Sequence, residues 1–306
     1  DAYEYLIAQF ASGAGKKAGE FYTPRSVVQL MGLIMDVKEG ESIYDPACGT
    51  GGMLLESVNH LKNEGKDYRT LKLYGQEKNL TSSSIARMNM FLHGFEDFKI
   101  ARGDTLRKPA FFEGDELQTF DCVIANPPFS LKEWGADNWA NDRYGRNLAG
   151  VPPKGNGDMA WVQHMIKSMR PGSGRMTVVL PQGVLFRKGA EGKIRKTLIE
   201  LDLLEAVIGI GQNIFYGTQL APSILVFNNN KVDGNKSKVI FIDASEQLKI
   251  GRAQNTLEKE HVDQIFEIWK FINYMSDEII DIKPDENKIN QSIQEIQKDI
   301  HQIQQK

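Results

Sequence analysis

Short apolar runs alternate with amphipathic stretches along most of this chain, and the alternation limits the folds it can adopt. The amphipathic stretches have helical periodicity at 51–63, 79–93, 158–169 and 189–201. The runs rich in β-branched residues are predicted strands at 42–45, 72–77, 98–102, 120–125, 175–181 and 205–210. Nearly continuous apolar strands that alternate with helices form parallel sheets covered on both faces. The sequence therefore predicts an α/β fold.

Two further apolar runs depart from this pattern. Residues 222–228 and 238–244 follow short loops with no helix between them. A parallel strand needs a crossover of a dozen or more residues, whereas an antiparallel strand needs only a tight turn. We therefore expect a mostly parallel sheet with an antiparallel edge formed by these two runs.

The chain divides by pattern into three parts. Residues 1–18 combine a helical pattern at 2–10 with a Gly/Lys-rich linker, and residues 19–250 hold the strand–helix alternation. Residues 251–306 are predicted to be helical and to bind a partner helix. The reason is a heptad spacing of isoleucines within 286–306, at Ile289, Ile293, Ile296, Ile300 and Ile303.

The composition argues against a disulfide-stabilised protein, a cysteine-based metal site and a membrane-spanning protein. Two cysteines among 306 residues argue against a disulfide framework or a cysteine-based metal site, and favour a reducing, cytoplasmic setting. No apolar run approaches the ~20 residues of a membrane span, and the start lacks a signal-peptide pattern. The net charge of −3 means that contact with nucleic acid would rely on local basic residues or on a partner. We expect no metal and no membrane.

Three successive predicted strands end in residues suited to an adenosine-containing cofactor. The first is followed by the glycine turn "DPACGTGG" (45–52), where the backbone can approach a ligand closely. The second ends in Glu77, which can accept hydrogen bonds from ribose hydroxyls, and the third is followed by Asp104, which can accept from an adenine amine. Each feature alone is better explained as an ordinary turn or a surface acid. Their combination favours the cofactor.

Asp45 helps to distinguish between the adenosine-containing cofactors that could bind at the glycine turn. A carboxylate beside the glycine turn would repel a pyrophosphate but can hold a cationic amino-acid group, directly or through water. S-adenosylmethionine therefore fits this turn better than NAD does.

The fourth predicted strand ends in "ANPPFS" (125–130), where prolines stop the sheet. The side-chain oxygen of Asn126 and the carbonyl of Pro127 can each accept a hydrogen from an aromatic amine, which aims its nitrogen lone pair at a methyl group. Pro127 and Pro128 restrict the backbone, so these acceptors are preorganised. Phe129 can stack on the substrate ring, as enzymes that flip bases require. No general base is needed before attack.

The order of "GEFYTP", "DPACGTGG", "GQE", "GDT" and "NPPF" resembles the N6-adenine DNA methyltransferases over roughly residues 1–245. "GEFYTPR" (19–25) and "GNGDMAWVQHM" (155–165) resemble the modification (M) subunit of type I restriction–modification systems in particular. The resemblance implies a Rossmann-like class I S-adenosylmethionine-dependent methyltransferase fold, with 19–250 as the catalytic domain.

The resemblance also implies a role for each matching residue. Those that would flank the methionine end of the cofactor are Glu20, Phe21, Tyr22, Thr23 and Pro24. Those that would line its body are Asp45, Thr50, Gly51 and Gly52, with Glu77 on the ribose and Asp104 near the adenine. The catalytic floor would be Asn126, Pro127, Pro128 and Phe129.

The activity implied is methyl transfer from S-adenosylmethionine to N6 of a flipped adenine in double-stranded DNA. A specificity (S) subunit would select the site, and a restriction (R) subunit would complete the assembly. Family members usually carry a helical domain ahead of "GEFYTP", where here about 18 residues stand. The strand-four motif alone also allows methylation of RNA or of a protein amide, and a scaffold that binds cofactor without catalysis is a further alternative. "GEFYTPR" argues against the first and Asn126 against the second.

The aperiodic stretch 131–157 and a few other residues have open roles. Trp134, Trp139 and Tyr144 are equally suited to clamping a base and to packing a loop. The basic run 187–196 fits a solvated helix face better than a phosphate site.

Two other groups are expected to be packing residues. Phe215 or Tyr216 fits a core aromatic better than a base-stacking one. His93 and His164 lie on helical patterns and are predicted to pack rather than to bind a ligand.

Overall fold

The computed structural model describes residues 23–215, 220–252 and 254–275. Several predictions concern residues outside these ranges. They are the helix at 2–10, the cofactor contacts of Glu20, Phe21 and Tyr22, the aromatic Tyr216, and the isoleucine repeat at 289–303.

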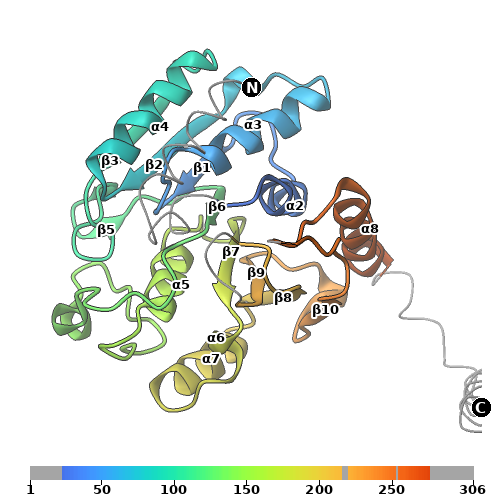
Figure 1. Ribbon diagram of the computed structural model, residues 1–306. Helices are drawn as coiled ribbons and strands as arrows, with labels where there is room; N and C mark the ends of the chain where they lie inside the picture. Colours follow the sequence, from blue (N-terminus) through green and yellow to red (C-terminus); the bar gives the residue numbers. More distant parts are fainter. Residues whose placement is uncertain (1–22, 216–219, 253, 276–306) are drawn as a thin grey trace, which may run out of the picture.

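An eight-stranded sheet has the order β10-β8-β9-β7-β6-β1-β2-β3 (Figure 1). Its strands are β1 (Ser42–Asp45), β2 (Lys72–Glu77), β3 (Phe98–Arg102), β6 (Cys122–Ala125), β7 (Arg175–Pro181), β8 (Leu204–Ile210), β9 (Pro222–Asn228) and β10 (Ile240–Ala244). A separate hairpin joins β4 (Phe112–Glu113) to β5 (Glu116–Leu117). All neighbours in the large sheet are parallel except β9, which is antiparallel to both β7 and β8.

The predicted mostly parallel sheet is confirmed, but the placing of its antiparallel part at an edge is wrong. β9 lies inside the sheet, between β7 and β8, and β10 forms the edge and runs parallel to β8. Six of the seven residues of β9 are buried, so this strand needs a neighbour on each side. Buried and exposed residues alternate along β10, as expected of a strand with one face in solvent.

Helices cover both faces of the sheet, as predicted (Figure 1). One face carries α2 (Arg25–Met35), α3 (Gly52–Asn63), α4 (Leu80–Leu92) and α8 (Lys259–Met275), and the other carries α5 (Asp158–Lys167), α6 (Gly183–Phe186) and α7 (Ala190–Glu200). Short 3-10 helices span Tyr68–Thr70, Asp233–Asn235 and Ala136–Asn141. Ile43 packs into the first core and its neighbour Tyr44 into the second, because successive strand residues point to opposite faces.

Helix α8 belongs to the predicted C-terminal segment, yet it packs on α2 and β10. Its residues Val262, Ile265 and Trp269 are buried in the same core as α2 and α3. The first part of 251–306 therefore shares a core with the principal domain. The boundary at residue 250 remains a prediction.

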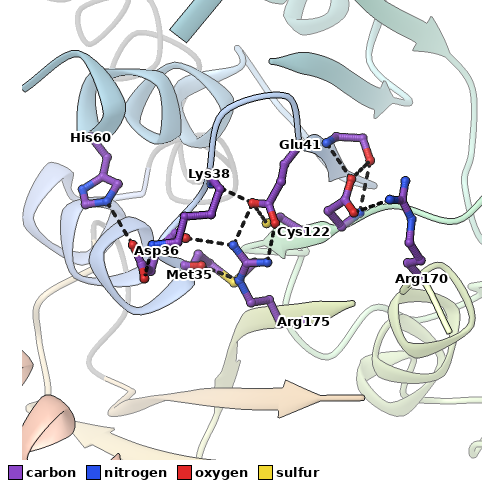
Figure 2. Close-up of polar contacts among 10 residues, drawn as sticks. Met35, Asp36, Lys38, Glu41, His60, Cys122, Arg170 and Arg175 are labelled. Carbon is purple, nitrogen blue, oxygen red and sulfur yellow. Dashed lines mark hydrogen bonds and ion pairs between the residues drawn. The ribbon is translucent and has the colours of Figure 1, made fainter. Parts of the chain in front are cut away.

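Polar contacts close the edge of the sheet where the parallel strands begin (Figure 2). Arg175, the first residue of β7, donates to the carbonyl oxygens of Met35 (2.5 Å) and Asp36 (2.9 Å) at the end of α2. Its guanidinium also makes two hydrogen bonds of 2.9 and 2.8 Å with the Glu41 carboxylate. A cation at the end of a helix satisfies carbonyls that have no partner within the helix. Arg175 thereby joins α2 to the sheet.

A second contact at this edge aligns β1 with β6. The backbone N–H and the hydroxyl of Ser42 both donate to Asp121, at 2.9 and 2.7 Å, and Arg170 forms an ion pair with the same carboxylate (Figure 2). The amino ends of the central strands are thus tied together by side chains.

Across the described ranges, no helix is long and apolar enough to cross a membrane.

We predict that Arg175→Met lowers the free energy of unfolding by about 2–4 kcal/mol, because it leaves Glu41 and two helix carbonyls without their donor. Urea denaturation measures the change. Arg69→Met is the control: Arg69 is 76% exposed and, among the described residues, forms a surface pair with Asp67, so its loss should change the stability far less than the loss of Arg175. Equal effects of the two substitutions would contradict the role given to Arg175.

Candidate active site

The strand order reverses between β1 and β6, and the candidate site lies at this point. From β1 the chain continues outward to β2 and β3, and it then returns to β6 on the other side of β1. The two connections leave the carboxyl ends of β1 and β6 in opposite directions, which opens a crevice between them. A cavity of about 590 Å³ opens at this edge. Four predicted site residues line it: Glu77, Asp104, Asn126 and Pro128.

Hydrogen bonds to β2 shape the glycine turn after β1. The N–H of Cys48 donates to the carbonyl of Gln76 (3.1 Å), and the N–H of Gly49 donates to the Glu77 carboxylate (3.0 Å). The other oxygen of Glu77 accepts from the N–H of Asn79 (2.6 Å), at the start of α4. Glu77 therefore holds the turn and the next helix together at the cavity wall. A carboxylate accepts about four hydrogen bonds, so acceptor capacity remains.

Asp45 is buried at the base of the turn, with 2% of its surface exposed. Burial raises the pKa of Asp45 to about 8, against a hydrogen bond from the N–H of Ala47 that lowers it, and the nearby charge of Glu77 raises it further. The carboxyl group is therefore mostly protonated at neutral pH in the free protein.

The other predicted residues of the turn contact α4. The carbonyl of Thr50 accepts a hydrogen bond from Asn89 (2.8 Å), and Gly51 has φ +86° and lies against Met90 and Ala86. Among the described residues, the cavity wall does not include Asp45, Thr50, Gly51 or Gly52. The structure thus gives Thr50 and Gly51 a packing role, and their predicted contact with a cofactor remains a prediction.

Asp104 lies at the rim of the cavity, after β3. Its carboxylate forms an ion pair with Lys78 (2.9 Å), which also lines the cavity, and lies 3.7 Å from Arg107. The same carboxylate accepts from the N–H of Arg107 (3.3 Å). Asp104 keeps one face toward the cavity while the cations stabilise its charge.

The amide of Asn126 has one partner and one unused acceptor. Its Nδ2 donates to the hydroxyl of Thr23 (2.8 Å), ahead of α2. Its Oδ1 is buried and accepts no hydrogen bond from the part of the chain that the structure describes. An orphaned acceptor inside a protein is costly unless a ligand donor completes it. Thr23, which is followed by Pro24 at the start of α2, thus orients the amide.

The rest of "NPPFS" is held in place by buried groups. Pro127 is buried, and the ring of Phe129 packs against Phe215, with 6.0 Å between centroids. The N–H of Ser130, which has φ +51°, donates to the Asp158 carboxylate (2.7 Å). Asp158 is fully buried and also pairs with Arg187 (2.9 Å).

Of these residues, sequence reasoning did not single out Asp158, although it quoted the segment that contains it. Phe215 is 2% exposed, so the prediction of a core aromatic at this position is confirmed.

The aromatic residues of the aperiodic stretch are packing residues. Trp134, Trp139 and Tyr144 are 1%, 2% and 7% exposed, and the two tryptophan rings meet edge to face. Trp161 of α5 belongs to the same cluster and lines the cavity. Its indole N–H is buried without a partner among the described residues. Sequence reasoning missed Trp161 because it sits on the apolar face of a helix, where a core residue is the ordinary expectation.

The remaining candidates are two histidines and the basic run 187–196. His164 is buried and its ring nitrogen lies 3.1 Å from the Tyr44 hydroxyl; burial places the pKa of His164 well below its ordinary value. His93 is exposed at the end of α4, with its ring nitrogen 2.8 Å from the carbonyl of Asn89, so the prediction that this histidine packs is wrong. In the basic run, Arg187 pairs with Asp158 and Glu191, and Lys196 pairs with Glu200 on the surface.

A comparison with known families identifies the family of this chain. A family model described as "N-6 DNA Methylase" matches residues 1–303. The chain belongs to the N-6 DNA methylase family.

Related proteins narrow the comparison within the N-6 DNA methylases. The chain is 37% identical to the type I restriction enzyme MjaIX methylase subunit of Methanocaldococcus jannaschii, over 94% of this chain and 50% of that protein. It is 34% identical to the HindI methylase subunit of Haemophilus influenzae, over 80% and 53%.

A solved relative has the same fold. The crystal structure of a type I restriction–modification methyltransferase subunit from Streptococcus thermophilus superposes with a TM-score of 0.79 at 36% identity, over 88% of this chain and 57% of that one. The chain spans about half the length of the curated relatives it matches.

We predict that Gly51→Ala lowers the free energy of unfolding by about 1–3 kcal/mol. The positive φ disfavours any side chain, and a Cβ would lie 2.7 Å from the end of Met90. Gly52→Ala is the matched control, because nothing lies within 4 Å of its Cβ position and it occupies the first turn of α3. Thermal and urea unfolding of the two variants should differ in this direction. Equal stabilities would show that the turn does not constrain Gly51.

Proposed function

We propose that this chain is the catalytic part of a type I restriction–modification M subunit, which transfers a methyl group from S-adenosylmethionine to N6 of adenine in double-stranded DNA. The observation that carries the proposal is the buried Oδ1 of Asn126 at the cavity between β1 and β6, which has no hydrogen-bond partner among the described residues. Membership of the N-6 DNA methylase family and the similarity to methylase subunits support it.

The residues present fit S-adenosylmethionine. The cofactor, when bound, supplies a methyl group made electrophilic by its sulfonium. Glu77 has acceptor capacity left for the ribose hydroxyls, and Asp104 stands one strand further along for the adenine amine. We assign Asp45 to the cationic amino-acid end, with Thr50, Gly51 and Gly52 along the cofactor body. Thr23 and Pro24 belong with Glu20, Phe21 and Tyr22 at the same end.

Asn126 activates the target amine by accepting a hydrogen bond from one of its N–H groups at Oδ1. The carbonyl of Pro127 accepts a hydrogen bond from the other N–H group. Because Thr23 takes the hydrogen bond from Nδ2, the amide presents oxygen rather than nitrogen to the substrate. This removes the lone pair of the amine from conjugation and directs it at the methyl group. Pro128 lines the cavity beside it, and we retain Phe129 as the residue that contacts the extruded base.

The partners follow from the same assignment. We propose that an S subunit selects the DNA site and docks on residues 286–306, that an R subunit joins the full complex, and that the assembly works in the cytoplasm. The relatives named as methylase subunits support a multi-subunit assembly.

We predict that Asn126→Ala lowers the rate of methyl transfer to DNA adenine by about 10²-fold or more and leaves cofactor affinity nearly unchanged. Glu77→Ala should instead weaken cofactor binding by about 1–3 kcal/mol. Methyl transfer is assayed with and without the S subunit, and binding is measured by calorimetry. Asn59→Ala on the surface of α3 is the control. Full activity of Asn126→Ala would overturn the mechanism, and methylation of RNA or protein but not DNA would overturn the substrate.

The pKa of Asp45 predicts a proton release on cofactor binding. A cationic group beside the carboxylate favours its ionised form, so a carboxyl with a pKa of about 8 should lose close to one proton when the cofactor binds at pH 7. Affinity should therefore rise as the pH increases toward 8. Calorimetry in buffers of different ionisation enthalpy counts the proton. Asp45→Asn should abolish the release, and an unchanged proton count in that variant would show that Asp45 is not the contact.

A further inference from the structure

A second cavity of about 440 Å³ lies next to the first, and its walls carry cations and aromatic rings. They come from 106–109 after β3, from Phe112 of the β4–β5 hairpin, and from 135–146 of the aperiodic stretch. We propose that this cavity binds a nucleotide of the DNA strand next to the extruded adenine, with its phosphate on the cations and its base on Phe112. The inference rests on the proposed function and extends its substrate site.

Contacts of Arg146 hold two segments of this cavity's wall together in the protein without a ligand. Its side chain is buried, pairs with Asp142 (2.6 Å), and donates to the carbonyls of Thr105 and Leu106 at 3.1 and 3.0 Å. Its guanidinium also lies over the ring of Trp139, 4.6 Å from the centroid. The aperiodic stretch is thereby fastened to the segment after β3. A site assembled in advance does not lose binding energy to ordering its loops.

The charge that faces the cavity is positive, although the chain carries −3 overall. Asp142 is the one carboxylate among the described lining residues, and Arg146 neutralises it. Lys108 is exposed and has no carboxylate within ion-pair distance in the described ranges. Arg107 is 54% exposed and lies 3.7 Å from Asp104.

Arg143 pairs with Asp115 at 2.7 Å, but both side chains are more than half exposed. Such surface pairs are worth little, so a phosphate can replace the carboxylate.

The aromatic part of the cavity is open to solvent. Phe112 is 42% exposed, so its ring is accessible to a base that enters the cavity. The Arg143 guanidinium lies 5.8 Å from the centroid of Phe112 and 5.0 Å from that of Tyr144. Cations and a ring on one wall suit a nucleotide, whose phosphate is anionic and whose base stacks.

The two cavities are lined by neighbouring parts of the chain, so one DNA strand can reach both. Asp104 and Thr105 line the first cavity, and the next residues along the chain line the second. Trp161 lines the first and Trp139 the second, and both belong to one packed cluster. A nucleotide adjoining the extruded base is thereby placed at the cations.

The test measures DNA affinity of the full-length protein against salt concentration, with a duplex oligonucleotide as probe. Lys108→Ala and Arg143→Ala should each weaken binding and make the slope of log affinity against log salt less steep by about 0.9, and the double variant by about 1.8. Phe112→Ala should weaken binding of a single-stranded oligonucleotide by about tenfold with an unchanged slope, since stacking carries no charge.

Lys236→Ala is the matched control, because Lys236 is an exposed lysine beyond β9, at the edge where the parallel strands begin. Affinity and slope equal to those of the control would overturn the inference. S-adenosylmethionine binding is measured on every variant and should not change. Unsubstituted protein that binds DNA but not S-adenosylmethionine would overturn the proposed function and leave the DNA measurement to decide this site.

Discussion

The reversal of strand order between β1 and β6 is the constraint on which the candidate site depends. Two crossover connections that leave neighbouring strands in opposite directions cannot both cover the space between them, so a crevice remains at the carboxyl edge. The glycine turn, Glu77 and Asn126 come from three different strand ends, and this reversal brings them to one cavity. Each of these groups would be an isolated polar residue in a sheet of another order.

The two edges of the sheet are built for different tasks. At the amino edge, Arg175 pairs with Glu41 and with the end of α2, and Asp121 separately pairs with Ser42 and Arg170, so the strands are locked there. At the carboxyl edge, Asp45 is buried with a raised pKa, and the amide oxygen of Asn126 has no partner in the described part of the chain. Buried polar groups that lack a hydrogen-bond partner or a counter-charge are unfavourable for folding, but they remain available to a ligand.

The roles of the aromatic residues in and around the aperiodic stretch 131–157 became clear only in the structure. Sequence reasoning left its aromatic residues divided between packing and base contact, because no period indicates which side chains turn inward. The structure buries Trp134 and Trp139 and leaves the exposed ring to Phe112, which belongs to a hairpin that the sequence did not reveal. Trp161 likewise looked like a core residue of α5, and its place at the cavity depends on how that helix meets the stretch.

The sequence by itself determined the strands and helices of the described fold, most of them to within two residues, because apolar periodicity and turn residues act locally. It also predicted which polar residues stand at the strand ends, since Glu77 is the last residue of its strand and Asp104 and Asn126 follow theirs within two residues. The tertiary structure decided where β9 inserts, that Thr23 orients Asn126, and that Asp158 holds Ser130. These contacts join residues that lie far apart in the chain. They form only when the whole sheet is paired, so no local pattern encodes them.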